Sequence, residues 1–290
     1  MRPSSKTCVV TGASGFLGRS LQAYLEGQGW SVTTWVRRPL KGSKAVRFEL
    51  GQNVSPTEFA NARALVHCAY DFSVRSRNEI REVNVIGSIK LLEAAREAGV
   101  ETIVFISTLS AFEGCRSLYG RAKLEIEATA HKMGANVIRP GLVYGKEGGG
   151  VFGRIVGLVR RSSVVPRLIG GQQMQYLVHE NDVGKLVQAC LEGRVPKPGE
   201  SIPIAHERGW ELTDIVLQIG RVLNRSFVLV PVPWQLAWLG LKMIEMVGGR
   251  PGFRSDSLLG MVYQCSNPNF ELTRSMGIKC QPFEPEKLVF

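Results

Sequence analysis

The segment Thr11-Gly12-Ala13-Ser14-Gly15-Phe16-Leu17-Gly18 decides the fold of this chain. It follows the apolar run 7–10, which predicts a short buried strand. It leads into residues 16–26, where leucines recur at helical spacing. The pattern therefore predicts a strand, a glycine-rich turn and a helix in direct succession.

Such a turn suits a phosphate, because it aims backbone N–H groups and the positive end of the helix at one point. Gly12 would allow the tight turn, and Gly15 would let a pyrophosphate approach closely. Gly18 would let the helix pack against the strand. An ordinary tight turn without a ligand is the alternative interpretation.

Length and composition describe an ordinary globular protein. The chain has 290 residues, 44% of them hydrophobic and 21% charged, which is enough for one large domain or a domain with a smaller lobe. The first residues lack the apolar core of a signal peptide, and the longest apolar run, 233–247, is too short to span a bilayer. Six scattered cysteines without a Cys-x-x-Cys pair predict reduced thiols and no metal site. We therefore expect a cytoplasmic protein without a transmembrane segment.

The formal net charge of +11 suggests anionic ligands. Lysines and arginines are spread along the chain without a dense block or a nucleic-acid motif, which argues against nucleic acid as the partner. A phosphate-rich cofactor and substrate would account for part of the charge. Non-specific attraction to nucleic acid or to an anionic membrane surface is the weaker alternative, and peripheral membrane contact stays open.

Short β-rich runs alternate with amphipathic helices along the first half of the chain. The predicted strands are 7–11, 31–36, 45–50, 64–69, 102–107 and 136–139. The predicted helices between them include 79–98 and 117–132. This order is typical of βαβ units, so the expected fold class is α/β, a Rossmann-type doubly wound parallel sheet with a smaller C-terminal substrate-binding lobe.

The second predicted strand ends in Arg37-Arg38, where a dinucleotide fold meets the adenosine ribose. An acidic residue there would hold the ribose hydroxyls of NAD, whereas arginine suits a 2′-phosphate. The sequence thus favours NADP(H) over NAD(H), unless both arginines are solvated surface residues. Glu49-Leu50, at the end of the third strand, could place a carboxylate near the adenine amine.

Two polar residues lie in otherwise apolar segments. His67 ends the fourth strand, where a hydrogen-bonded structural histidine is the more common outcome than a base. The small Ala69 beyond it would let a cofactor lie close. Asn84 falls inside a predicted helix and could simply bond to nearby backbone.

The chemistry is expected after the fifth strand, where Ser107-Thr108 leaves the carboxyl end of the sheet. Tyr119 and Lys123 follow four residues apart, so they share one face of a helix. A nearby ammonium stabilises a phenolate, so we expect Lys123 to lower the pKa of Tyr119 and make it usable as an acid or base. A Tyr–Lys pair on an exposed helix is common by itself, and only its context favours catalysis.

These motifs together resemble the extended short-chain dehydrogenase/reductase family, in its nucleotide-sugar epimerase/dehydratase group. The matching residues are Thr11-Gly12-x-x-Gly15-x-x-Gly18, His67-x-Ala69, Asn84, Ser107-Thr108, Tyr119-x-x-x-Lys123, Arg139-Pro140-Gly141-x-x-Tyr144-Gly145 and His179-x-x-Asp182. They follow in the expected order from residue 11 to about 182.

The resemblance implies a role for each matching residue. Thr108 would hydrogen-bond the reacting oxygen and Tyr119 would exchange its proton, while Lys123 holds the nicotinamide ribose and Asn84 helps to order the site. The chain has one extra residue after Thr108, and this leaves Ser110 as a rival for its role. The turn and the resemblance together predict cofactor contacts from Gly12, Ser14, Gly15, Phe16, Leu17, Gly18, Arg37, Glu49, Leu50, His67, Ala69, Lys123 and Pro140.

Departures from the family pattern narrow the expected reaction. Sugar dehydratases of this family carry an Asp-Glu pair after the threonine, and here those places hold Leu109 and Ser110. Dehydration is therefore not expected. Reduction of a keto sugar, or 4-epimerisation, remains.

From 146–150, a glycine-rich hinge, the sequence changes character. We expect residues 1–145 and about 176–205 to form the dinucleotide-binding domain, and 146–175 and 206–290 the smaller lobe. The resemblance implies that this lobe grips a substrate diphosphate, with Arg154 and Arg160 as candidates, although a solvated basic face is the alternative.

An apolar helix is expected from Trp234 onwards. Packing inside the lobe is its expected role, with membrane contact or a dimer surface as alternatives. The region loosely resembles bacterial nucleotide-sugar 4-ketoreductases.

The sequence therefore predicts an NADP(H)-preferring oxidoreductase that reduces a 4-keto nucleotide-diphosphate sugar for polysaccharide synthesis, with a homodimer as a possible state. An NAD-dependent 4-epimerase is the alternative within the same class. A non-catalytic NADP-sensing or structural protein is the alternative of another class.

Overall fold

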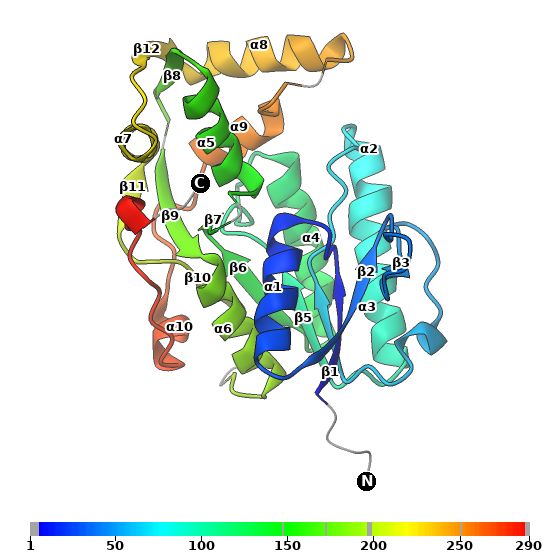
Figure 1. Ribbon diagram of the computed structural model, residues 1–290. Coiled ribbons are helices and arrows are strands. Elements are labelled where there is room, and N and C mark those ends of the chain that lie inside the picture. Colours follow the sequence, from blue (N-terminus) through cyan, green and yellow to red (C-terminus); the bar gives the residue numbers. More distant parts are fainter. Residues whose placement is uncertain (1–5, 147, 172, 196–198, 250, 288–290) are drawn as a thin grey trace.

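The computed structural model describes residues 6–146, 148–171, 173–195, 199–249 and 251–287. Within them, seven parallel strands form one sheet in the order β10-β6-β5-β4-β1-β2-β3 (Figure 1). The strands are β1 (Thr7–Thr11), β2 (Ser31–Val36), β3 (Val46–Arg47), β4 (Ala64–His67), β5 (Thr102–Ile106), β6 (Asn136–Pro140) and β10 (Ser201–Ile204). After β1 the chain adds β2 and β3 on one side and then returns to form β4 on the other side of β1. Parallel sheets bind ligands at such a change in strand order.

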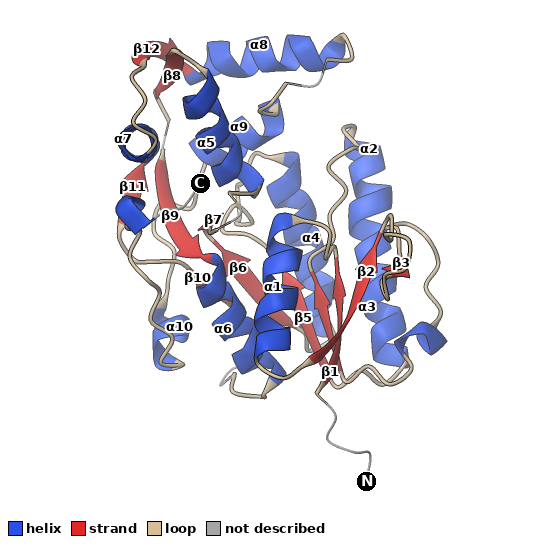
Figure 2. Ribbon diagram, viewed as in Figure 1, coloured by secondary structure: helices blue, strands red, loops and turns tan. Residues whose placement is uncertain are grey.

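Helices cover both faces of this sheet, as Figure 2 shows. Helices α1 (Phe16–Gly27) and α6 (Glu180–Leu191) lie in contact with each other on one face and share a buried cluster with β1 and β5. Helices α3 (Gly87–Glu97) and α4 (Leu118–Lys132) cover the other face, over a second cluster. Strands buried on both faces explain the nearly continuous apolar runs in the sequence. The predicted doubly wound α/β fold is confirmed.

Two predicted elements differ in detail. The strand expected at 45–50 is reduced to the two residues of β3, because this edge strand pairs only with the end of β2. The helix expected at 79–98 consists of α2 (Arg77–Glu79), a π-helical turn (Ile80–Ile86) and α3. The π-helical turn carries Asn84, whose side chain is fully buried. Such turns often occur near functional sites.

Above the carboxyl ends of the sheet lies a second layer with its own buried cluster. It contains a three-stranded sheet of β7 (Leu142–Tyr144), β9 (Met174–His179) and β11 (Gly209–Glu211), and a strand pair of β8 (Val164–Ile169) and β12 (Val228–Pro233). Its helices are α5 (Gly150–Arg161), α7 (Leu212–Val222), α8 (Trp234–Met246) and α9 (Ser255–Val262), and α10 (Glu271–Ser275) follows against β10. The division of the chain at 145, 176 and 205 stays a prediction, and residue 147 of the expected hinge lies outside the described residues.

Helix α8 corrects one expectation. The sequence predicts that this apolar helix packs inside the lobe, but none of its residues is buried. Leu236, Met243 and Met246 are 61%, 60% and 77% exposed. The helix contacts β8, β12 and α9 along one side only, at the edge of the molecule, so its other side faces solvent (Figure 1). Among the described residues, no helix is long and apolar enough to cross a bilayer.

The glycine turn is closed by direct backbone contact between β1 and α1. A Cβ atom on Gly18 would stand 2.3 Å from the carbonyl oxygen of Gly12, which is too close for any side chain. Gly12 itself has a φ of +70°, the left-handed region that favours glycine. A Cβ on Gly12 would meet the backbone of Ala69 at 2.8 Å. The close approach of α1 to β1 therefore requires glycine at both positions.

We predict that Gly18→Ala lowers the free energy of unfolding by about 1–3 kcal/mol, because the backbone must shift to admit the methyl group. Gly27→Ala is the matched control, since a Cβ there meets nothing within 4 Å. That change should leave stability equal or raise it by up to about 1 kcal/mol. Urea denaturation of both variants measures the difference, and equal stability would contradict the close contact.

Candidate active site

A cleft of about 500 Å³ lies between the carboxyl ends of the strands and the second layer. Most of the predicted site residues line it, from the turn after β1, the ends of β2, β5 and β6, the segments after β3 and β4, and helices α4 and α5. These are Gly12, Ser14, Gly15, Phe16, Leu17, Gly18, Arg37, Leu50, Ala69, Thr108, Ser110, Tyr119, Lys123, Pro140 and Arg154. The fold therefore brings together residues that are up to 142 positions apart in the chain.

The turn after β1 fits the diphosphate of a dinucleotide. The N-cap of α1 is Gly15, which gives no side-chain hydrogen bond, and the first turn of the helix carries no acidic residue. Within the described part of the chain, the first turn of α1, which lines the cleft, therefore has no side-chain cap. Arg19 donates to the carbonyl of Ser14 (2.6 Å), on the outer side of the turn. Anionic oxygens are the natural partners of such a helix terminus.

At the far end of the cleft, Arg37 follows β2 and forms an ion pair with Asp71 (3.1 Å). The side chain of Arg37 is 54% exposed, so this pair contributes little stability and leaves the guanidinium accessible. Asn84 holds Asp71 in place: its Oδ1 accepts from the Asp71 N–H (2.6 Å), and its Nδ2 donates to the Asp71 carbonyl (3.0 Å). Asn84 thus orders the cleft wall from behind without lining the cleft.

Lys123 lies at the floor of the cleft and is 2% exposed. Its ammonium donates to the carbonyl of Ile106 (2.7 Å) at the end of β5 and lies 5.9 Å from the centre of the Tyr119 ring. The Tyr119 ring packs edge-on against Tyr70 (4.8 Å between centroids) and at a tilt of 31° against Phe72 (5.7 Å). These two aromatic residues follow β4 and were not predicted from the sequence, where no motif distinguishes them.

Burial dominates the protonation of both groups. It lowers the pKa of Lys123 to about 8, with Cys68 and Glu127 opposing the shift. The pKa of Tyr119 is raised, chiefly by burial and further by Cys68. The expectation that the pKa of Tyr119 is lowered is therefore wrong. Burial favours the protonated form of the phenol.

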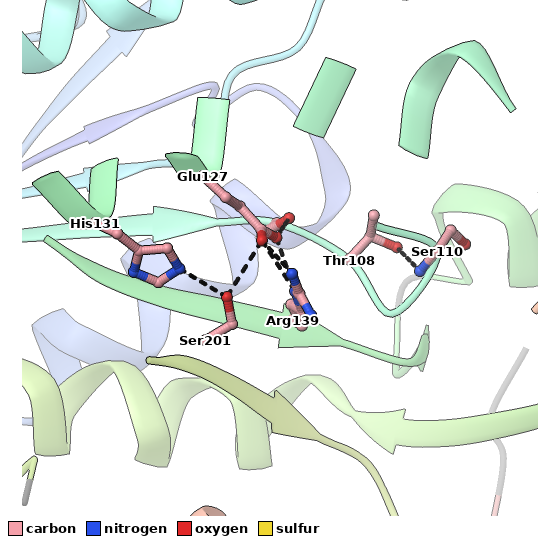
Figure 3. Close-up of polar contacts among 7 residues, drawn as sticks. Thr108, Ser110, Glu127, His131, Arg139 and Ser201 are labelled. Atoms are coloured by element: carbon pink, nitrogen blue, oxygen red, sulfur yellow. Dashed lines mark hydrogen bonds and ion pairs between the residues drawn. The ribbon is translucent and has the colours of Figure 1, made fainter. Parts of the chain in front are cut away.

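Thr108 and Ser110 both lie at the cleft and contact each other (Figure 3). The Thr108 hydroxyl accepts from the Ser110 N–H (3.2 Å), which leaves its own hydrogen available to donate. The Ser110 hydroxyl accepts from Gln264 of the second layer (3.4 Å). Ser110 is thus engaged with the second layer, whereas the Thr108 hydroxyl contacts the backbone of its own loop.

A buried carboxylate that sequence reasoning missed lies beneath this site. Glu127, 2% exposed, accepts hydrogen bonds from Ser107, from both ends of the Arg139 fork and from Ser201 (Figure 3). His131 continues the network to Ser201 (2.9 Å). Glu127 follows Lys123 by one helical turn, so the spacing Tyr119, Lys123, Glu127 along one face was the signal available in the sequence.

The second layer contributes a charged wall opposite Tyr119. Asp256 of α9 accepts from the backbone N–H groups of Leu118 (2.6 Å) and Tyr119 (3.1 Å), so it caps helix α4. Arg254 donates to the carbonyl of Phe72 (3.0 Å), while its Nε is buried and has no hydrogen-bond partner among the described residues. Burial, and the nearby charge of Arg254, lower the pKa of Arg154. Arg254 and Asp256 carry no motif and were not predicted.

Four predicted site residues do not line the cleft. His67 is fully buried under it, bonded to Thr11 (2.7 Å) and Ser88 (2.9 Å), and burial with the charge of Lys123 lowers its pKa to about 3. His67 is therefore a hydrogen-bonded structural histidine and not a base, which is the outcome that the sequence favoured. The other three are Asn84, Glu49 and Arg160. Glu49 lies on an edge segment where Phe48 and Leu50 face inward instead, and Arg160 lies on the exposed side of α5.

Comparison with known proteins supports the same assignment of the fold. The model of the NAD dependent epimerase/dehydratase family matches residues 8–205. Among curated proteins, a UDP-glucose 4-epimerase of Vibrio cholerae is 26% identical over 266 residues, covering 80% of each chain. A ceramide reductase of Caulobacter vibrioides is 29% identical over 235 residues, covering 77% of this chain and 73% of its own.

Solved structures agree in architecture. An epimerase from Methanothermobacter thermautotrophicus superposes with a TM-score of 0.76 at 17% identity, covering 97% of this chain and 89% of its own. A UDP-glucose 4-epimerase of Thermus thermophilus, solved with NAD, gives a TM-score of 0.68 at 19% identity, covering 97% of this chain and 96% of its own. At these identities the likeness concerns the fold.

The lowered pKa of Lys123 predicts a pH dependence of stability. An unfolded lysine titrates near 10.5, so between pH 8 and 10.5 the unfolded chain binds the extra proton and wild-type stability rises with pH. Relative to Lys123→Met, the wild-type free energy of unfolding should therefore increase above pH 8, by at most about 1.4 kcal/mol per pH unit. Below pH 8 the difference should be flat.

Chemical denaturation of both proteins from pH 6 to 10 measures this difference. Lys132→Met, at the exposed end of the same helix, is the matched control for loss of a positive charge. A constant difference between wild type and Lys123→Met over the whole range would contradict the burial of a charged Lys123.

Proposed function

Because this chain belongs to the NAD-dependent epimerase/dehydratase family, whose members are enzymes, we propose that it reduces the 4-keto group of a diphosphate-linked sugar, as in nucleotide sugars, with NADPH. One observation carries the proposal. Tyr119, Lys123 and Thr108 line one cleft together with the glycine turn after β1. A proton donor and a dinucleotide cradle thus share a single wall.

The proton chemistry belongs to Tyr119. The bound nicotinamide supplies the hydride, and the chain supplies orientation and the proton. The Tyr119 hydroxyl donates its proton to the substrate oxygen as that oxygen gains negative charge, while Thr108 donates a hydrogen bond to the same oxygen. Because its pKa is raised, Tyr119 is protonated at neutral pH, which is the form that a reductase requires.

Lys123 acts from the floor of the cleft. Its ammonium is held at the Ile106 carbonyl, close to where a nicotinamide ribose would lie over the end of β5. With a pKa of about 8 it is mostly charged at pH 7, so it stabilises negative charge as it develops on the phenol. Glu127, one turn further along α4, favours the charged form of Lys123.

The departures from a dehydratase pattern support reduction. Leu109, in the place of the first acidic residue, is 6% exposed and its N–H donates to the carbonyl of Pro140. Ser110 follows it. Neither position offers a carboxylate for the elimination of water, so we exclude dehydration from the proposal.

The substrate half of the cleft fits a diphosphate. Arg154 and Arg254 both line it, and their charges are close enough to disfavour each other. A diphosphate between them would relieve this repulsion and would give the Nε of Arg254 an acceptor. Arg160, on the exposed side of α5, has no part in this proposal.

A 4-epimerase is the second candidate. The similarity to a UDP-glucose 4-epimerase favours it, because an epimerase uses the same proton and hydride transfers in both directions. Tightly bound NAD in the purified protein would favour that candidate, and net oxidation of NADPH by a 4-keto sugar would favour the reductase.

We predict that Tyr119→Phe lowers turnover by about 10²- to 10⁴-fold while the dissociation constant for NADPH changes by less than about threefold. NADPH oxidation with a 4-keto-6-deoxy nucleotide sugar measures the first quantity, and fluorescence titration the second. Tyr24→Phe, on the far side of α1, is the control for loss of a phenol. Unchanged turnover in Tyr119→Phe would reject the role of Tyr119 and favour a non-catalytic protein.

The cofactor proposal gives a separate prediction. If Arg37 holds a 2′-phosphate, Arg37→Ala should weaken NADPH binding about tenfold or more and change NADH binding by less than about threefold. Arg63→Ala is the control, since Arg63 pairs with Glu101 on the surface outside the cleft. Equal effects of Arg37→Ala on the two cofactors would reject the preference for NADP(H).

A further inference from the structure

A second and larger cavity lies in the upper layer, between α5, α7, α8 and the β8–β12 pair. Its volume is about 900 Å³, within the usual range for ligand sites and well above the voids of an ordinary core. Its lining is predominantly aliphatic and includes Val165, Leu168, Leu229, Val232, Leu241 and Leu258. Such a surface fits a ligand that is itself apolar.

This cavity adjoins the catalytic cleft, and Gly150, Arg154 and Met261 line both. One elongated molecule that passes the side chain of Arg154 would reach both spaces. Arg154 and Arg254 repel each other at this point. The part of the ligand that lies there should therefore carry negative charge.

Helix α8 forms the outer wall of the second cavity. Leu236, Ala237, Gly240, Leu241 and Ile244 line it, and yet Leu236 and Ile244 remain largely exposed to solvent. Aliphatic side chains that line a cavity without being buried lose contact with water when an apolar chain lies against them, and this favours binding. The fold thus presents two arginines, Arg154 and Arg254, where the catalytic cleft meets an apolar cavity.

We propose that this enzyme accepts a lipid-linked sugar diphosphate. The sugar lies in the catalytic cleft, the diphosphate at Arg154 and Arg254, and a long hydrocarbon chain in the second cavity. The placement of the sugar rests on the function proposed above, whereas the apolar chain rests on the second cavity alone. A nucleotide sugar shares the sugar and the diphosphate, but its nucleoside is too polar to account for an aliphatic cavity.

The cavity can be filled without disturbing the fold. Gly157 of α5 lines it, and a Cβ atom there meets nothing within 4 Å. Gly157→Leu places an isobutyl group in the cavity and replaces glycine in a helix with a better helix former. Gly240→Leu does the same from α8. Gly27→Leu, on the exposed end of α1 and outside both cavities, is the matched control.

The test is direct binding of farnesyl diphosphate, below its micelle concentration, by calorimetry, with UDP as the polar diphosphate. Wild type and Gly27→Leu should bind farnesyl diphosphate at least tenfold more tightly than inorganic diphosphate. Gly157→Leu and Gly240→Leu should each weaken farnesyl diphosphate at least tenfold and UDP by less than twofold, whereas Arg154→Ala should weaken both.

Equal binding of farnesyl diphosphate and inorganic diphosphate, or unchanged farnesyl diphosphate binding in both leucine variants, would overturn the proposal. These readouts do not depend on turnover. Farnesyl diphosphate binding, together with no NADPH oxidation when the 4-keto-6-deoxy nucleotide sugar is supplied, would reject the proposed reaction and keep the lipid site. Turnover of a nucleotide sugar without farnesyl diphosphate binding would do the reverse.

Discussion

The contact between Gly18 and the carbonyl of Gly12 is the constraint on which the site depends. It brings the first turn of α1 against the end of β1, and this places uncapped helix N–H groups at the mouth of the cleft. The backbone of Ala69, just after β4, closes on Gly12. Because three backbone segments meet without side chains between them, the space above the sheet stays open for a dinucleotide. Tyr119 and Lys123 line this same space.

The sequence predicts most of this half of the molecule because its signals are local. Glycine spacing, apolar strand runs and the Tyr119–Lys123 pair each lie within one or two turns of chain, and the doubly wound sheet follows from their order. The residues that the sequence does not predict are those whose position depends on tertiary packing. Arg254 and Asp256 line the cleft, although they come more than 130 residues after Tyr70 and Tyr119 in the chain. They belong to the second layer, whose packing produces no regular spacing in the sequence. His67 matches a family motif but is fully buried, and only its neighbours Thr11 and Ser88 reveal that.

The direction of the Tyr119 pKa shift is a similar case. Proximity of an ammonium argues for a lowered pKa, and burial argues for a raised one. The aromatic rings of Tyr70 and Phe72, which the sequence does not mark, enclose the phenol and make burial the larger effect. Helix α8 is another case in which packing decided the outcome. Its apolar composition predicted burial, but the packing leaves the helix exposed.

The capping of α4 by Asp256 ties the two layers together. Its carboxylate holds the backbone of Leu118 and Tyr119 from a helix that belongs to the substrate side. A ligand that displaced α9 would therefore also move the backbone that carries Tyr119, because Asp256 joins the two by hydrogen bonds. If Tyr119 is the proton donor, as proposed, a ligand that shifts α9 would also change the position of the Tyr119 hydroxyl. Substrate selectivity would then depend on the orientation of this proton donor as well as on the shape of the pocket.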